Sequence, residues 1–336
     1  MSPAPSSGGR GKGGRAPAPK GGSRGAAPSK GPEAKAAWMK AKDAKAGRGA
    51  GVGRGSVAQG RASVSDRGRG PGGKDIPVRR GPRHEGLGGD QVEGRQAVRE
   101  LLHAGRRPIT TLMMAEGMDA AEILDDIEAL AIKRRVKVDY VSRKRIDATA
   151  RTDGSQGVVA LARAIDETPL EALCQPTKRG RLPFLLILDG ITDPHNLGAV
   201  LRSAECAGVT GIVLPRHRSA HLSPTVAKVA AGAIEYLPMA LVAGIPTALQ
   251  QLSGLGVVTV GLVGEAPTSL YKLPLGNQPV ALVLGSEGSG LAALTRKRCD
   301  ELAAIPQHGT LSSLNVATAG AIACFDVARQ RIAAGN

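Results

Sequence analysis

Three polar segments in the second half of the chain carry the residue types that could perform chemistry. They are residues 189–196, 285–290 and 305–315, and each directly follows an apolar run typical of a buried strand. Loops that follow rigid, buried elements commonly hold binding and catalytic residues. In parallel α/β sheets, ligands bind beyond the carboxyl ends of the strands. We therefore expect the three segments to meet and to form a ligand site.

Taken one at a time, the polar residues of these segments also suit ordinary structural roles. Asn196 and Asn315 lie where helices are expected to begin, and Asn commonly caps a helix N-terminus. Ser313 is suited to local backbone hydrogen bonds of the same kind. Arg202 lies on the expected helix after the first segment, where pairing with Glu205, three positions on, is one possibility. The three segments together, rather than any single residue, indicate a function.

The second segment, GSEGSG at residues 285–290, is rich in glycine, which lets a backbone approach a ligand closely. It has no Lys-Ser/Thr ending of the P-loop type, and the chain has no G-x-G-x-x-G at this point. Glu287 lies in the middle of the segment and would repel a phosphate. This segment therefore suits a hydroxyl, an amine or a cationic ligand.

The cysteines and histidines form no pattern typical of a metal site. The four cysteines are far apart without a C-x-x-C pair, and the histidines near the three segments lack metal-ligand spacing. We therefore expect no metal, no disulfide framework and a reducing compartment. The G-x-S-x-G motif of a Ser-His-Asp hydrolase is also absent.

The elements that must position the three segments alternate between strand and helix. The predicted strands are residues 183–189, 211–214, 235–242, 257–263, 279–284 and 301–305, and the predicted helices are residues 197–207, 246–252, 291–299 and 316–331. Such alternation favours an α/β fold with a mostly parallel sheet that is covered by helices on both faces.

A smaller α/β domain is predicted upstream, at residues 90–165. Apolar residues at helical spacing follow Val92, and Gly105 and Pro108 end that helix. A strand (110–115), a helix (120–134), a strand (137–141), a basic turn (143–145) and a strand (157–163) complete the domain. Residues 166–181, with two prolines and a glycine, are interpreted as a linker to the domain at residues 182–336.

Residues 1–85 form a basic arm with a different composition. They hold 19 Lys and Arg against 5 Asp and Glu, a net charge of +14 out of +16 for the whole chain. With so little apolar surface to bury, the arm is predicted to be disordered. Its charge favours binding to a polyanion such as nucleic acid, with little sequence preference; a merely solubilising arm is the alternative.

No apolar run approaches the roughly 18 residues that span a bilayer, and no secretory signal begins the chain. Together with the unpaired cysteines, this predicts a cytoplasmic protein.

The three segments read together as D-P-H-N-L-G-A-V-L-R, L-G-S-E-G-S-G-L and I-P-Q-H-G-T-L-S-S-L-N-V. In order and separation they resemble motifs 1, 2 and 3 of the SpoU (TrmH-type) RNA 2′-O-ribose methyltransferases of the SPOUT superfamily. The upstream domain, which opens V-E-G-R-Q-A-V-R-E-L-L, is similar to the ribosomal-protein-like RNA-binding domain of bacterial 23S rRNA guanosine-2′-O-methyltransferases. Family members that act on tRNA usually lack this domain, so the resemblance implies an rRNA substrate.

The resemblance also implies S-adenosylmethionine as the methyl donor, a trefoil knot in the C-terminal domain, and a homodimer with the site near its interface. Residues at motif positions implied in catalysis or substrate placement are Asn196, Arg202, Glu287, Ser313 and Asn315. Those whose backbone is implied in holding the adenosine of the donor are Gly285, Ile305 and Leu314. The segment Ala317–Thr318–Ala319–Gly320 departs from the more polar family pattern, and His308 replaces a residue that is usually small or apolar.

Two alternatives stay open within this interpretation and one outside it. The chain could modify a uridine or cytidine, or a tRNA, with the same motifs. It could also be an inactive RNA-binding protein of ribosome assembly, although intact motif residues argue against this. A nucleotide-binding oxidoreductase is disfavoured by the missing dinucleotide motif.

Overall fold

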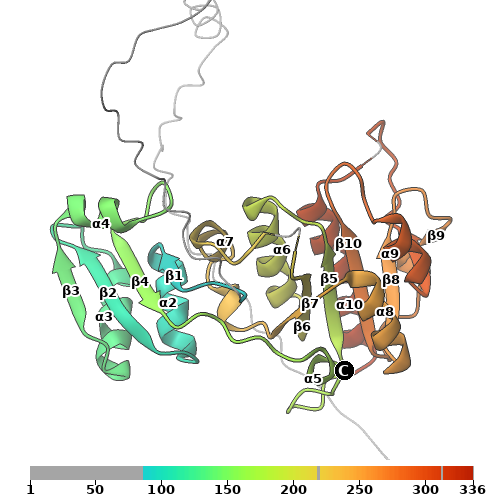
Figure 1. The fold of residues 1–336 in the computed structure, drawn as a ribbon, viewed down its shortest axis with the longest axis horizontal. Helices are drawn as coiled ribbons and strands as arrows, with labels where there is room; N and C mark the ends of the chain where they lie inside the picture. The colour runs from blue at the N-terminus through green and yellow to red at the C-terminus, as the bar shows by residue number, and fades with distance from the viewer. Residues whose placement is uncertain (1–85, 218–219, 312, 336) are drawn as a thin grey trace, which may run out of the picture. The chain divides into compact units, whose positions relative to one another are not determined.

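A computed structural model describes residues 86–217, 220–311 and 313–335 (Figure 1). The chain divides into two units, Met1–Pro77 and Val78–Asn336, and all described residues belong to the second. The basic arm predicted at residues 1–85 lies outside the described residues. No helix among the described residues is both long enough and apolar enough to cross a membrane.

The first part of the described chain folds around a four-stranded sheet. The strand order is β1 (Gln91–Glu93), β4 (Val158–Ala162), β2 (Ile109–Ala115) and β3 (Val138–Val141). Strand β2 pairs in parallel with β3 and antiparallel with β4. The helices are α2 (Arg95–Ala104), α3 (Glu122–Arg134) and α4 (Arg143–Thr149).

Helix α2 shows why the sequence folds as predicted here. Its Ala97, Val98, Leu101 and Leu102 are all buried, as the helical spacing requires. Gly105 ends the helix in the left-handed conformation, with φ of 56°, and its N–H donates to the carbonyl oxygen of Leu101. The basic turn predicted at residues 143–145 is wrong, because these residues form the first turn of α4, which buries only Ile146.

The second sheet has seven strands, and every strand pair in it is parallel. The order is β7 (Met239–Val242), β6 (Gly211–Pro215), β5 (Phe184–Asp189), β10 (Val280–Gly285), β8 (Val258–Leu262), β11 (Glu301–Ala304) and β9 (Thr268–Ser269). The predicted mostly parallel sheet is thus confirmed. Strand β9 was not predicted, because two residues carry no periodicity.

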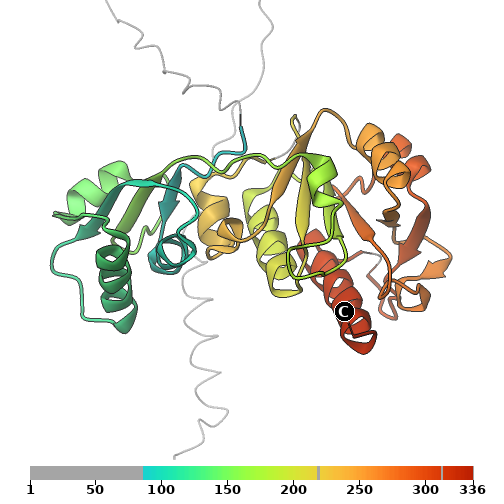
Figure 2. The same cartoon turned by 90° about the horizontal axis from the view of Figure 1, so that it is seen from below.

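Helices cover both faces of this sheet, as predicted (Figures 1 and 2). One core packs under α6 (Pro194–Cys206), α7 (Pro224–Val229) and α10 (Val316–Ala333). The other lies under α5 (Leu170–Leu173) and α8 (Ile245–Gly254). Leu291 and Cys299, which lie before and after α9 (Ala293–Arg298), pack against it. Residues 166–181 were interpreted as a linker, yet they contain α5, whose Leu170 and Leu173 are buried in this second core.

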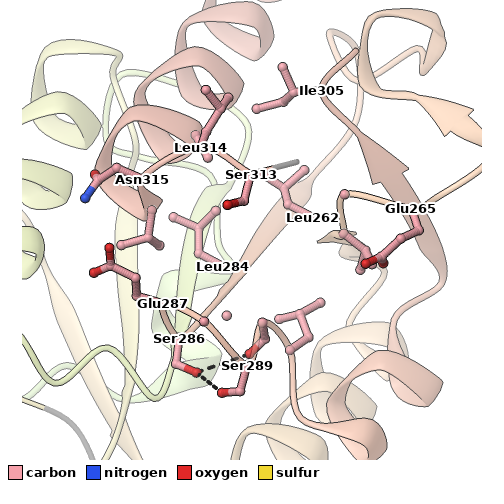
Figure 3. A pocket seen from close by; sticks show the side chains of 18 of the residues that line it. Leu262, Glu265, Leu284, Ser286, Glu287, Ser289, Ile305, Ser313, Leu314 and Asn315 are labelled. Carbon is pink, nitrogen blue, oxygen red and sulfur yellow. Dashed lines mark hydrogen bonds between the residues drawn. The ribbon is translucent and has the colours of Figure 1, made fainter. Parts of the chain in front are cut away.

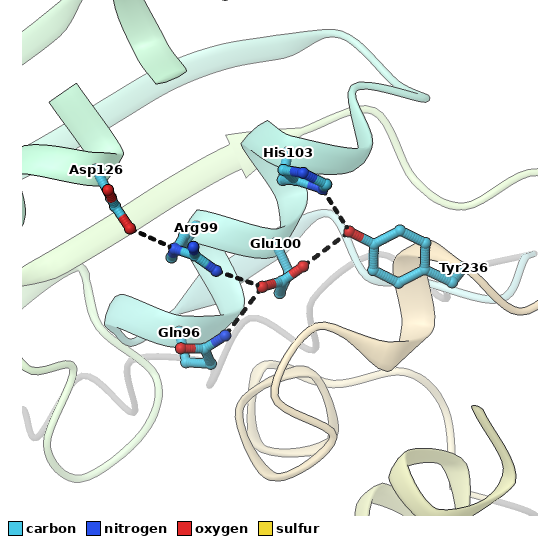
Figure 4. A network of polar contacts seen from close by, with 6 residues as sticks. All are labelled: Gln96, Arg99, Glu100, His103, Asp126 and Tyr236. Atoms are coloured by element: carbon cyan, nitrogen blue, oxygen red, sulfur yellow. Dashed lines mark hydrogen bonds and ion pairs between the residues drawn. The ribbon is translucent and has the colours of Figure 1, made fainter. Parts of the chain in front are cut away.

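Polar contacts join α2 to the turn that follows the short 3-10 helix η1 (Ala233–Glu235) (Figure 4). The Tyr236 hydroxyl donates to Glu100 Oε2 at 2.7 Å and lies 3.1 Å from His103 Nδ1. Burial and the hydrogen bond to Glu100 raise the pKa of Tyr236 to about 12. Beside this network, Arg107 forms a buried ion pair with Glu235 at 2.6 Å.

The centre of the seven-stranded sheet brings two of the three polar segments side by side. Strands β5 and β10 are neighbours in register, so that Gly285 is paired with Asp189. Residues 190–193, which follow β5, and the glycine-rich loop after β10 therefore leave the same edge of the sheet.

Candidate active site

A cavity of about 440 Å³ opens beyond the carboxyl end of β10 (Figure 3). Six of the predicted site residues line it: Gly285, Glu287, Ile305, Ser313, Leu314 and Asn315. The wall combines apolar side chains with the backbone of the glycine-rich loop, and the volume is that of a typical small-molecule site. The second and third polar segments thus meet in one cavity, as predicted.

The loop at residues 285–290 is a tight, closed turn. The Ser286 N–H donates to the Gly290 carbonyl oxygen and the Gly290 N–H to that of Ser286, both at 3.0 Å. The hydroxyl oxygens of Ser286 and Ser289 are 2.5 Å apart. A Cβ added to Gly285 would lie 2.1 Å from the carbonyl carbon of Gly290, so any side chain there would displace the loop. The glycine at this position is therefore required by packing.

Asn196 connects the three segments although it is not part of the cavity wall. Its Nδ2 donates to Glu287 Oε2 at 2.8 Å, and its Oδ1 accepts from Asn315 Nδ2 at 2.9 Å. Both ends of the Asn196 amide are therefore used, one toward each of the other two segments. This chain of hydrogen bonds fixes the Glu287 carboxylate beside the start of α10.

Of the two asparagines at expected helix starts, only Asn315 caps its helix. Asp193, not Asn196, caps α6: its carboxylate accepts from the N–H groups of His195 at 3.0 Å and Asn196 at 3.3 Å. Pro194 follows as the first helical residue, a common arrangement. Asn315 does cap α10, with its Oδ1 accepting from Ala317 N–H at 2.8 Å. The side chain of Asn196 is thereby left available for the inter-segment contacts.

Arg202 is placed apart from the other predicted site residues. It lies exposed on α6, does not line the cavity, and makes no hydrogen bond or ion pair with a described residue. It lies six positions after Asn196, about 9 Å along a helix axis. The structure therefore brings together seven of the eight predicted residues, through the cavity wall or the Asn196 hydrogen bonds, and Arg202 is the exception.

Other residues of the wall were missed from the sequence. Gly264 and Glu265 follow strand β8, and Arg296 comes from α9. The rule that found the other segments, polar residues directly after a buried strand, would have identified Gly264 and Glu265. Arg296 carries no such signal, because it belongs to a six-residue helix.

The thiol of Cys299, the residue that follows α9, is poorly suited to act as a nucleophile. Burial, reinforced by the carboxylates of Asp300 and Asp189, raises the pKa of Cys299 to about 12. It is therefore protonated at neutral pH. Within residues 86–217, 220–311 and 313–335, no group of three or more His, Cys, Asp or Glu side chains could hold a metal ion.

The fold and the cavity define a class: a parallel α/β domain that binds a small ligand in loops beyond the carboxyl ends of its strands. Comparison with known families is more specific. Residues 183–325 match the SpoU rRNA Methylase family, and residues 91–168 match the RNA 2′-O ribose methyltransferase substrate-binding domain.

The chain matches curated relatives over almost the whole length of those relatives. The chain is 38% identical over 245 residues to the 23S rRNA (guanosine-2′-O-)-methyltransferase RlmB of Pseudomonas putida, covering 72% of this chain and 97% of that protein. It is 41% identical over 246 residues to RlmB of Shewanella oneidensis, covering 72% and 98%. The chain therefore belongs to the SpoU family of RNA 2′-O-ribose methyltransferases.

Solved structures agree with this assignment. The AdoMet-bound rRNA methyltransferase of Sinorhizobium meliloti has a TM-score of 0.59 at 27% identity, covering 71% of this chain and 86% of that one. A crystal structure described as an RNA 2′-O ribose methyltransferase has a TM-score of 0.60 at 26% identity, covering 72% and 88%.

Proposed function

We propose that the protein methylates the ribose 2′-hydroxyl of a guanosine in 23S rRNA, with S-adenosylmethionine as the methyl donor. The observation that carries this proposal is the cavity walled by the second and third motif segments and linked to the first through Asn196. The identity of the RNA is supported by the RlmB relatives and by the matched substrate-binding domain.

The wall of the cavity fits this donor. Leu262, Leu284, Ile305 and Leu314 supply apolar surface for an adenosine, next to the backbone of Gly285. Glu265 and Glu287 give the wall negative charge, which suits a sulfonium cation better than a phosphate. When bound, S-adenosylmethionine supplies a methyl group that is already activated on its sulfonium.

The residues of the chain then have to align the acceptor oxygen and favour loss of its proton. We assign Asn196, Ser313 and Asn315 to orienting the ribose, and Glu287 to holding the loop through its bond to Asn196. Correct alignment of two reactants can remove up to about 7–11 kcal/mol from a barrier. We assign Arg202 to stabilising the developing alkoxide, since a guanidinium stays protonated and is a poor general base.

Two exposed apolar side chains lie on α10, next to the helix that carries the exposed Arg202. Phe325 and Ile332 lie on α10 with 50% and 78% of their surface exposed. We propose that this apolar pair contributes to a homodimer interface, because α10 packs beside α6, the helix that carries Arg202. Sedimentation of the wild-type chain and of Phe325→Glu should give a dimer and a monomer, respectively.

Residues 90–165 are proposed to bind the RNA substrate and residues 182–336 to form the catalytic domain, with residues 166–181 between them. A trefoil knot in the catalytic domain is part of the proposal, and the sheet order, in which β5 and β10 are neighbours and α10 packs against them, is compatible with it. The cytoplasm, where rRNA is found, is the proposed location.

Methylation of purified RNA tests the proposal directly. The protein is incubated with S-adenosylmethionine and unmodified 23S rRNA, 16S rRNA or tRNA, and 2′-O-methyl sites are mapped by resistance to alkaline cleavage. We expect one guanosine of 23S rRNA to be modified. Modification of tRNA alone would contradict the substrate, and donor binding without modification of any RNA would favour an inactive RNA-binding protein.

A further inference from the structure

Arg296 is the only cationic side chain among the described residues that line the cavity. The same wall holds two carboxylates, Glu265 and Glu287. A pocket with this charge distribution is adapted to a ligand that carries more than one cationic group and at least one anionic group. Neither the motif resemblance nor the placement of the predicted residues gives Arg296 a role.

The backbone of Arg296 is held in place although its side chain is exposed. It lies on α9, and its N–H donates to the Ala292 carbonyl oxygen at 2.9 Å. The preceding residue, Thr295, is fully buried, and Leu291 and Cys299 pack against the second core before and after the helix. Helix α9 directly follows the glycine-rich loop, so Arg296 reaches the cavity from an anchored position.

The guanidinium of Arg296 has no hydrogen bond or ion pair with any described residue. No ion pair joins it to Glu287, whose Oε2 accepts a hydrogen bond from Asn196 at 2.8 Å. An arginine fork matches the two oxygens of a carboxylate, and such charge-assisted pairs are stronger than neutral hydrogen bonds. The side chain is therefore free to bind an anionic group of the ligand.

We propose that Arg296 binds the carboxylate of the methionine part of S-adenosylmethionine. This rests on the proposed function and extends it to a residue outside the three motifs. S-adenosylmethionine carries a sulfonium, an ammonium and a single carboxylate, which matches two acidic and one basic side chain in the wall. A phosphate of the RNA substrate has the same anionic oxygen chemistry, and the experiment separates the two sources.

The test compares two donors on full-length protein by calorimetric titration. Decarboxylated S-adenosylmethionine keeps the sulfonium and the amine but lacks the carboxylate. We expect Arg296→Gln to weaken binding of S-adenosylmethionine by at least about tenfold, while leaving the affinity for the decarboxylated compound unchanged. Arg296→Lys, which keeps the charge but not the fork, should recover part of the loss.

The matched control is Arg298→Gln, which removes the same charge from the same helix at a position outside the cavity wall. It should bind both donors as the wild-type chain does. Unchanged affinity of Arg296→Gln for the decarboxylated donor also shows that this variant is folded. The difference between the two donors isolates the carboxylate contact, as in a double-mutant cycle.

Two results would overturn the inference. Arg296→Gln could weaken both donors equally, or it could weaken neither. In the second case, weakened RNA binding in a filter assay would assign the side chain to a phosphate. If the wild-type chain bound neither donor, the proposed function would fail as well, and this outcome is distinguishable because it does not involve the variants.

Discussion

Asn196 determines the geometry of the site through both ends of one amide. It donates to Glu287 and accepts from Asn315, and these two residues belong to different segments of the chain. A carboxylate at position 196 could not donate to Glu287 and would repel it. An alanine would simply leave both partners without this contact, at a cost of about 1 kcal/mol per hydrogen bond.

We therefore expect Asn196→Asp to lose more donor affinity than Asn196→Ala, with losses of roughly tenfold or more for the aspartate. Calorimetric titration with S-adenosylmethionine measures this. His195→Ala, which removes an exposed neighbour whose side chain makes no hydrogen bond or ion pair with a described residue, is the control. Equal affinity of the Asp and Ala variants would contradict the role given to the amide.

Arg202 is the residue whose assignment depends most on the family resemblance. Arg202→Ala should abolish methyl transfer while leaving donor affinity within about twofold, because the side chain does not line the cavity. Single-turnover methylation and donor titration on the same preparation measure both quantities. Retained transfer would refute the assignment.

The thiols should differ in reactivity according to their surroundings. Burial raises the pKa of Cys324 to about 12, whereas Cys206 is exposed. Only thiolates are alkylated rapidly, so a raised pKa keeps Cys324 protonated and unreactive at pH 8. Mass spectrometry after iodoacetamide treatment should find Cys206 modified first and Cys324 only in urea. Early labelling of Cys324 in the native protein would contradict its burial.

At the scale of elements, the buried ion pair of Arg107 and Glu235 connects the turn before β2 to η1. Besides the ion pair, Arg107 Nη1 donates to the carbonyl oxygens of Gly89 at 2.5 Å and Arg163 at 2.6 Å. Removing one partner of a buried pair leaves the other charge without compensation, which typically costs about 3–5 kcal/mol. The stabilising role of the pair thus depends on both members being present.

Arg107→Ala should accordingly lower the free energy of unfolding of the segment that contains it by about 3 kcal/mol or more. Urea unfolding followed by circular dichroism measures the change. Arg163→Ala removes an exposed ion pair with Asp166 and should cost less than about 1 kcal/mol. Similar losses for the two variants would show that Arg107 does not act through a buried pair.

The sequence predicted the long, strongly patterned elements and missed the short ones, for physical reasons. Six strands of the parallel sheet were found because buried strands are continuous apolar runs. Helix α7 and strand β9 have six and two residues, too few for a period to show. Capping of α6 was the structural alternative for Asn196, but Asp193 caps this helix and Pro194 follows at its first position, a common helix start.

The candidate site was predictable in its composition but not in its connections. Polar residues after buried strands located the second and third segments in one cavity, because carboxyl ends of parallel strands share an edge. No one-dimensional pattern shows that Asn196 bonds to Glu287 or that Arg202 is absent from the cavity wall. Both facts depend on how α6 is rotated about its axis when its buried face packs against the sheet.

At the scale of the whole molecule, the basic arm should govern RNA affinity rather than chemistry. Deleting residues 1–85 removes a net charge of +14. The logarithm of RNA affinity should then fall less steeply with the logarithm of salt concentration, because fewer counterions are released on binding. Filter binding at several salt concentrations measures the slope, and single-turnover methylation at saturating RNA should be unchanged.

A Gly/Ser arm of equal length is the control, because it keeps the chain length and removes only the charge. It should behave as the deletion does. If either variant kept the wild-type salt slope, the arm would have no part in RNA binding and would be merely solubilising.

The position of β10 has a consequence during synthesis. It pairs with β5 on one side and β8 on the other, but it follows Asp189 by about 90 residues. At roughly 5–20 residues per second, the ribosome needs about 5–20 s to make that stretch. Throughout this interval β5 has an open backbone edge, which is a template for pairing with other chains. Pairing of β5 with a foreign strand is therefore the expected hazard of this strand order until β10 emerges.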